Sequence, residues 1–131
     1  MNEDNRVVLD ASAILAIILQ ERHEAFLTPE ILGKATASTV NIAEVQTSLV
    51  RRGLEPEMAW KDALGVAAEV VPFTTNHAKI AGTLTTLTRG LGLSLGDRSC
   101  LALAITLNAP VYTADKAWRN LTLSIPIHVI R

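Results

Sequence analysis

Residues 95–104 read LGDRSCLALA, and this stretch decides how the rest of the chain is interpreted. It places one acidic residue, Asp97, at the start of a strongly apolar helical segment that continues to Leu107. Moving a carboxylate toward an apolar interior costs free energy unless a partner neutralises its charge. Asp97 therefore needs either a capping role or a site to explain it.

Three further acidic residues repeat the arrangement, each where an extended apolar run gives way to a helical pattern: Asp10, Glu44 and Asp115. Two carboxylates about 5 Å apart repel by roughly 3 kcal/mol at an effective dielectric constant of about 20. A divalent cation turns that repulsion into binding energy, and oxygen ligands without paired Cys or His favour Mg²⁺, or Mn²⁺ as its substitute, over zinc. We therefore predict that these carboxylates and Asp97 meet in space and hold a metal.

Length and composition predict one folded domain, residues 1–131, with an aliphatic core. Hydrophobic residues make up 49% of the chain and charged residues 19%, which excludes general disorder. The formal net charge of −1 gives no global attraction for nucleic acid. If RNA is the partner, its phosphates must therefore be met by basic residues that are clustered locally.

The cysteine count and the apolar run near the start bear on localisation. Cys100 is the one cysteine of the chain and cannot form an internal disulfide, so we expect a cytoplasmic protein. The apolar run from Ala11 to Leu19 is far shorter than the roughly 20 residues of a membrane-spanning helix, and acidic residues precede it. We interpret this run as a buried helix and expect no membrane association.

Apolar periodicity and turn residues predict an α/β fold in which strands and helices alternate. Strands are expected at Arg6–Leu9, Ala35–Ser38, Val70–Phe73, Val111–Thr113 and Ile127–Ile130. Helices are expected at Ala11–Glu21, Thr28–Leu32, Asn41–Arg52, Pro56–Ala68, Thr75–Arg89, from Asp97 to about Asn108, and from Lys116 to Arg119. Crossover connections imply a mainly parallel sheet of four to five strands covered on both faces, with ligands bound beyond the carboxyl ends of the strands.

Helix capping is the competing interpretation of every acid. Asp10 and Asp115 stand where N-caps are expected, and Ser94 with Asp97 has the spacing of a capping box. Capping and metal binding are compatible, because a helix N-terminus keeps a nearby carboxylate ionised.

Glu44 is the weakest candidate by pattern alone. Asn41 and Glu44 also have capping-box spacing, and the apolar positions Ile42, Val45 and Leu49 share a helix face from which Glu44 points away. Periodicity therefore predicts a solvent-facing Glu44.

Several neighbours of the acids have both a structural and a functional interpretation. Ser12 and Thr113 carry hydroxyls that could orient a carboxylate or a water, although Ser12 also suits a first helical turn. Arg98, Lys116 and Arg119 are interpreted first as surface residues and second as phosphate contacts, while Cys100 and Trp118 are expected in the core. The three histidines, His23, His77 and His128, lack ligand spacing and receive no role.

Four segments in this order, VVLDASAILA, STVNIAEV, LGDRSCLALA and PVYTADKAW, resemble the PIN domain and, more narrowly, the VapC toxins of toxin–antitoxin pairs. The resemblance implies a three-layer α/β/α fold and a Mg²⁺-dependent endoribonuclease that cleaves structured RNA such as tRNA or rRNA. Such toxins form homodimers and are silenced by a VapB-type antitoxin. The family's acidic quartet and supporting positions match these residues: Asp10, Glu44, Asp97 and Asp115, with Ser12, Asn41 and Thr113 in support.

Two other function classes compete with the nuclease. A phospho-acceptor signalling module has two adjacent acids after its first strand and a third acid at the end of a middle strand. In this chain Ala11 follows Asp10, and the strand Val70–Phe73 is followed by Thr74. A non-catalytic binding domain would keep the acids as caps alone. A Mn²⁺ titration separates the last possibility from the nuclease, because caps scattered over the fold share no metal site.

Overall fold

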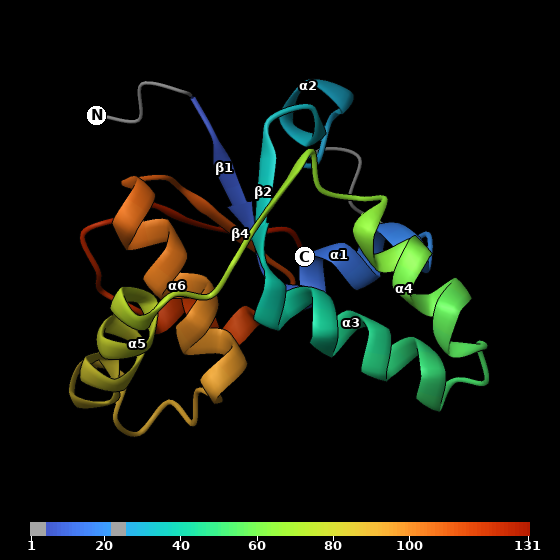
Figure 1. The fold of residues 1–131 in the computed structure, drawn as a ribbon. Coiled ribbons are helices and arrows are strands. Elements are labelled where there is room, and N and C mark those ends of the chain that lie inside the picture. Colours follow the sequence, from blue (N-terminus) through green and yellow to red (C-terminus); the bar gives the residue numbers. More distant parts are fainter. Residues whose placement is uncertain (1–4, 22–25) are drawn as a thin grey trace.

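Five short parallel strands form the centre of the computed structural model, which describes residues 5–21 and 26–131 (Figure 1). The order across the sheet is β3-β2-β1-β4-β5, and all four strand pairings are parallel. The predicted parallel sheet is therefore confirmed. The strands are β1 (Val7–Leu9), β2 (Ala35–Ser38), β3 (Glu69–Val71), β4 (Val111–Thr113) and β5 (Ile127–Val129).

Helices cover both faces of this sheet, so the molecule has three layers. One layer holds α1, α3 and α4, and the opposite layer holds the packed pair α5 and α6 (Figure 1). This arrangement confirms the expected α/β/α fold. The helices are α1 (Ala11–Ile18), α2 (Pro29–Leu32), α3 (Thr39–Arg51), α4 (Pro56–Leu64), α5 (Thr75–Leu87), α6 (Leu95–Leu107) and the 3-10 helix η1 (Lys116–Asn120).

The first strand divides the core into two halves. Successive side chains of a strand point to opposite faces of the sheet. Val7 and Leu9 accordingly pack into the apolar cluster under α1, α3 and α4, whereas Val8 packs into the cluster under α5 and α6. Burial on both faces explains why β1 reads as a continuous apolar run. It also fixes the position of the residue that follows it, Asp10.

Several element boundaries differ from the prediction because local turns end the helices early. α1 stops at Ile18, short of Glu21, because Gln20 takes the left-handed conformation with φ of 58°. α4 stops at Leu64 because Gly65 caps it, so the predicted extension to Ala68 is wrong. α5 ends at Leu87, two residues before the predicted end at Arg89, and Leu87 is 66% exposed whereas Leu84 is buried.

The apolar run of α1 is a core helix, as expected. Ala13, Ile14 and Ala16 are fully or almost fully buried against the sheet and α3. In the part of the chain that the structure describes, no helix combines the length and hydropathy required to cross a bilayer.

Candidate functional site

Asp10 lies at the carboxyl end of the central strand β1, in the turn that leads into α1. It is the N-cap of α1, and its Oδ1 accepts the backbone N–H of Ala13 at 2.8 Å. Only 3% of the residue is exposed. The capping role predicted for Asp10 is thus confirmed, and its carboxylate is held in one orientation at the edge of the sheet.

Two hydroxyls from neighbouring elements also bind this carboxylate. Thr113, the last residue of β4, donates its Oγ1 hydroxyl to Asp10 Oδ2 at 2.5 Å. Ser12 Oγ lies 2.8 Å and 2.9 Å from the two Asp10 oxygens and accepts the backbone N–H of Ala114. The two residues expected to orient the first acid therefore contact it directly.

Burial raises the pKa of the Asp10 carboxyl to about 6, and the negative charge of Asp97 adds to the rise. The hydrogen bonds from Thr113, Ala13 and Ser12 act in the opposite direction and lower the pKa. These donors prefer the ionised carboxylate, whereas the apolar surroundings disfavour it. A carboxylate held ionised against this cost is suited to binding a cation.

Asp97 lies in the first turn of α6 and forms the predicted capping box with Ser94. Ser94 Oγ accepts the N–H of Asp97 at 3.1 Å, and Asp97 Oδ2 accepts the N–H of Ser94 at 2.9 Å. Among the described residues, none donates a hydrogen bond to Asp97 Oδ1, so one oxygen is left for another partner.

Glu44 is half-buried and faces the start of α6. Its Oε1 accepts the side-chain N–H of Asn41 at 2.8 Å, and the same amide donates to the carbonyl of Gly96 at 3.0 Å. The side chain lies so close to Gly96 that a Cβ there would stand 2.0 Å from Glu44 Oε2. The periodicity prediction of a solvent-facing Glu44 is therefore confirmed only in part: Glu44 lies outside the buried face of Ile42, Val45 and Leu49 and is half-exposed, but its carboxylate also contacts Asn41 and lies against Gly96.

The capping box predicted for Asn41 and Glu44 is wrong. α3 begins two residues earlier, at Thr39, and Ser38 is its N-cap, accepting the N–H of Val40. Asn41 is therefore free to bridge α3 and α6 with its buried side chain. The match between cap spacing and the Asn41–Glu44 spacing was coincidental, because an i, i+3 pair also lies on one face of a helix interior.

Cys100, in the middle of α6, is affected by the charges of three of the acids. Burial raises the pKa of its thiol well above the usual range, and the charges of Asp10, Asp97 and Glu44 each raise it further. Asp97 likewise adds to the elevated pKa of Glu44, after the larger effect of burial. The charge of Asp97 thus acts on both Asp10 and Glu44, and all three acids act on one core position.

Asp115 stands beside this group and lines a surface pocket together with Ser12. It is exposed and is the N-cap of η1, with Oδ1 accepting the N–H of Ala117 at 3.0 Å. Its backbone N–H donates to Thr113 Oγ1, the hydroxyl that binds Asp10. The predicted cap is confirmed, and the link between Asp115 and the other acids runs through its backbone.

The donor set suits a hard divalent cation, although the four carboxylates do not surround one point. Within residues 5–21 and 26–131, no three His, Cys, Asp or Glu side chains are arranged to hold a metal ion together. Mg²⁺ is usually held by one or two carboxylates and keeps several waters. The mutually repelling Asp10 and Asp97 fit that pattern, and Gly96 leaves the space in which the Glu44 carboxylate lies.

The remaining residues singled out by sequence have structural roles. Arg98 donates to the carbonyl of Ala81 and Arg119 to that of Arg131, so both guanidinium groups bind backbone. Trp118 and Cys100 are buried, as expected. His77 caps α5 with Thr74, His128 stacks on Tyr112 with ring centroids 4.8 Å apart, and His23 lies outside the described residues.

Gly96 is the site residue that sequence reasoning missed. Its position next to Asp97 in an apolar helix could have indicated this role, because glycine in a helix costs about 1 kcal/mol relative to alanine and is usually kept for close packing.

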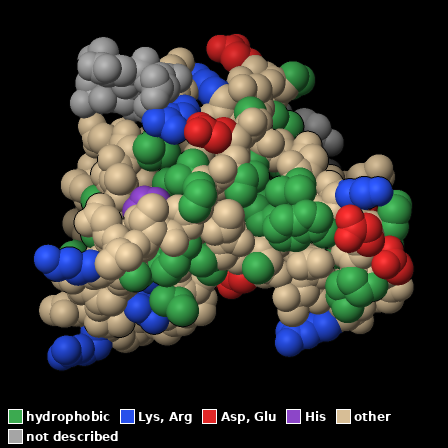
Figure 2. Space-filling view, in the orientation of Figure 1, with side chains coloured by type: hydrophobic (Ala, Val, Ile, Leu, Met, Phe, Trp, Pro, Cys, Tyr) green, Lys and Arg blue, Asp and Glu red, His purple; other side chains and the backbone are tan. Residues whose placement is uncertain are grey.

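Figure 2 shows the surface indented between the α3–α4 helices and the α5–α6 pair, with acidic side-chain atoms at the indentation.

Comparison with known proteins assigns this arrangement to a family. The family model for the PIN domain matches residues 7–122. The fold is similar to that of a chain in VapBC2 from Rickettsia felis bound to a promoter DNA fragment, with a TM-score of 0.73, 19% identity and coverage of 95% of this chain and 98% of that one. No curated protein matches the chain.

Two further solved complexes contain a similar chain. DNA-bound VapBC from Salmonella typhimurium gives a TM-score of 0.75 and 16% identity, covering 96% of this chain and 98% of that one. VapBC-5 from Mycobacterium tuberculosis, a member of a family of toxin–antitoxin systems, gives a TM-score of 0.65 and 18% identity, covering 96% and 99%.

Proposed function

This chain belongs to the PIN-domain family, and from that premise we propose that it is the toxin of a VapBC-type toxin–antitoxin pair, acting as a Mg²⁺-dependent endoribonuclease. The observation that carries the proposal is the placement of Asp10 at the carboxyl end of β1 and of Asp97 at the start of α6, where Asn41 links Glu44 to the neighbouring Gly96. Capping explains Asp10 and Asp97 one at a time, but it does not explain why Glu44 is turned toward them.

The site residues divide the work between holding a cation and orienting the acids. Asp10 and Asp97 would hold the metal, with Glu44 next to them, while Ser12, Asn41 and Thr113 fix the carboxylates by the hydrogen bonds described above. When bound, the metal supplies an activated water and stabilises the charge that develops on the scissile phosphate. Asp115 lies at the rim, where an exposed carboxylate is able to bind a coordinated water.

The donors around Asp10 have a further effect on the chemistry. Because three hydrogen bonds favour its ionised form, the carboxylate stays charged near neutral pH despite its burial. A fixed, buried carboxylate requires little reorganisation when a cation arrives, and this preorganisation is the main contribution of a protein to electrostatic catalysis.

Partners and substrate follow from the same proposal. The similar chains occur in VapBC and FitAB complexes, which supports a VapB-type antitoxin as the partner of this chain. We propose structured RNA, such as tRNA or rRNA, as the substrate, a homodimer as the assembly and the cytoplasm as the location. The single cysteine, buried in α6, suits a reducing compartment.

The direct test is RNA cleavage by purified protein with Mg²⁺. We expect the wild type to cut tRNA or a synthetic stem-loop RNA, to lose activity with EDTA and to regain it with Mn²⁺. Asp97→Asn should abolish cleavage, whereas Asp62→Asn, which removes an exposed acid of α4, should not. Full cleavage by the Asp97→Asn protein, or in excess EDTA, would contradict the proposed mechanism.

A further inference from the structure

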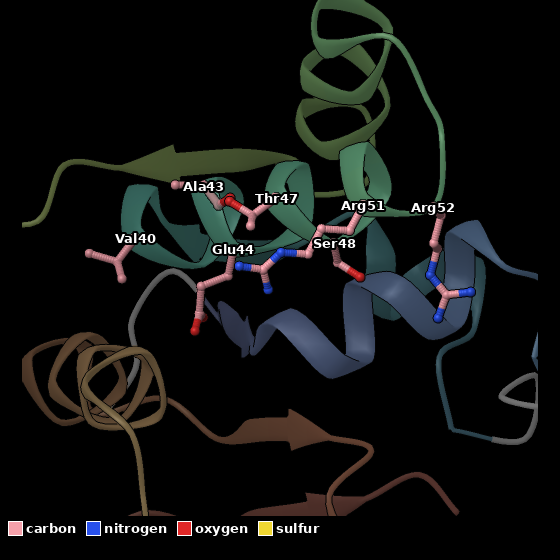
Figure 3. A pocket seen from close by; sticks show the side chains of 7 residues that line it. All are labelled: Val40, Ala43, Glu44, Thr47, Ser48, Arg51 and Arg52. Carbon is pink, nitrogen blue, oxygen red and sulfur yellow. The ribbon is translucent and has the colours of Figure 1, made fainter.

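A groove runs along the exposed side of α3, beginning at the acidic site (Figure 3). It has a volume of about 720 Å³ and is lined along one helix by Val40, Ala43, Glu44, Thr47, Ser48, Arg51 and Arg52. Glu44 belongs both to the acid group and to this lining. The groove is therefore continuous with the proposed site and changes from acidic to basic along its length.

Helix geometry sets the distance between its two charged ends. Glu44, Ser48 and Arg51 are separated by four and three residues, so they lie along one face of α3. A rise of 1.5 Å per residue places the backbones of Glu44 and Arg51 about 10 Å apart. This distance equals about three stacked nucleotide steps of ~3.4 Å.

The Arg51 side chain shortens this distance. In Figure 3 it extends back along α3 in the direction of Glu44, while the Arg52 side chain points across the helix axis. Side chains on a helix lean toward its N-terminus, so this direction is the ordinary one. The guanidinium group of Arg51 thus lies in the groove, closer to Glu44 than the Arg51 backbone is.

Neither arginine is engaged elsewhere. Both are exposed, and within the chain segments that the structure describes their guanidinium groups form no ion pair or hydrogen bond. Their positive charges also interact favourably with the helix dipole at the C-terminus of α3, but that interaction does not require the arginines to line a groove. The lining between the charged ends consists of two short side chains, Thr47 and Ser48, which leave room for a polymer backbone.

We propose that this groove binds the phosphodiester backbone of a single-stranded RNA segment, with Arg51 on a phosphate next to the scissile one and Arg52 on a more distant one. The inference rests on the proposed nuclease function and names the residues that hold its substrate. It also explains how a chain with a net charge of −1 attracts a polyanion, because the positive charge is concentrated where the strand leaves the acids. A guanidinium group suits this role because it binds phosphate oxygens with two parallel N–H donors.

The experiment measures binding and cleavage of a fluorescein-labelled single-stranded 12-mer RNA as NaCl is varied, with binding measured in EDTA so that the RNA stays intact. For the Arg51→Gln variant, we expect binding about tenfold weaker than wild type at 150 mM NaCl. The slope of log K against log salt should fall by about 0.7, the value of one phosphate contact to a single strand. The Lys79→Gln variant removes one exposed charge from α5 and should leave both quantities unchanged.

Two further measurements separate the alternatives. Arg51→Lys keeps the charge but loses the paired donors, so it should restore the salt slope and only part of the affinity. If Arg51→Gln binds and cleaves like the wild type, the groove assignment is wrong while the nuclease proposal stands. If the wild type binds the 12-mer through Arg51 but cleaves no RNA, the groove assignment stands and the nuclease proposal fails.

Discussion

The Glu44 carboxylate fills the space in which a side chain at Gly96 would begin, since a Cβ on Gly96 would stand 2.0 Å from Glu44 Oε2. The two residues lie on different helices, α3 and α6, and Asn41 ties the helices together by donating to both Glu44 and the Gly96 carbonyl. The absence of a side chain at one position therefore determines the direction of a carboxylate on another element.

Gly96→Ala should separate activity from stability. Alanine favours the helix by about 1 kcal/mol, and the group it meets is the far end of a flexible side chain that is able to move away. We expect a folded protein of about wild-type stability whose Glu44 carboxylate is displaced and whose RNA cleavage falls at least about tenfold. Urea unfolding and cleavage rates measure the two effects.

Gly82→Ala is the matched control for this variant. Gly82 lies inside α5, and nothing stands within 4 Å of a Cβ built there. The substitution should stabilise the protein by about 0.5–1 kcal/mol and leave cleavage unchanged. Equal activity of the Gly96→Ala and Gly82→Ala proteins would show that the position of Glu44 does not matter for cleavage.

Asp10→Asn should raise the free energy of unfolding at pH 7.5. Burial raises the folded-state pKa of Asp10 to about 6, from 3.8 for an ordinary aspartate. The folded protein therefore binds this proton more tightly than the unfolded chain, so stability falls as the pH rises from about 4 to 6 and stays lower above that range. Removing the charge should raise the free energy of unfolding by about 1–2 kcal/mol at pH 7.5, and this value already subtracts the cost of losing one acceptor oxygen.

The stability gain of the Asp10→Asn protein over the wild type should depend on pH, and this dependence tests the prediction. At pH 4 the Asp10 carboxyl is protonated in the folded protein, so the gain from the substitution should vanish there. Chemical denaturation of both proteins at pH 4, 5.5 and 7.5 measures this difference. A gain that is the same at all three pH values, or a loss of stability at pH 7.5, would contradict the assignment of a buried, ionised carboxylate.

Thr113→Val should destabilise the protein by about 1–3 kcal/mol without a large change of shape. The hydroxyl of Thr113 donates to Asp10 Oδ2 and accepts the N–H of Asp115, so valine leaves both groups without that partner. The pKa of Asp10 should also rise further, because this hydrogen bond is the largest influence that lowers it. Thr113→Ser keeps the hydroxyl and should recover most of the loss in a urea titration; a Ser variant as unstable as Val would rule out the hydrogen bond as the cause.

Sequence reasoning predicted those parts of the site that depend on a single element. Asp10 and Asp97 were found because each breaks an apolar run at the start of a helix, and the parallel sheet followed from alternating strands and helices. Capping chemistry is local, and it correctly identified Ser94 with Asp97 and the N-cap role of Asp115.

Contacts between distant elements could not be predicted in the same way. Periodicity places Glu44 relative to its own helix, but its direction is set by Gly96 and Asn41, and Asn41 meets Gly96 across a separation of 55 residues. The groove on α3 was missed for a similar reason, because Arg51 and Arg52 look like ordinary surface charges until Glu44 is placed at the other end. Resemblance to PIN domains predicted Glu44 as a candidate site residue where its own helix pattern did not.

The central claim is that Asp10 and Asp97, with Glu44 next to them, form a site for a divalent cation, and Mn²⁺ binding tests it most directly. Calorimetric titration of the wild type should show saturable binding. Asp97→Asn should weaken it at least about tenfold, and Asp62→Asn on α4 should leave it unchanged. No saturable Mn²⁺ binding by the wild type, or equal affinity in the Asp97→Asn protein, would contradict the account.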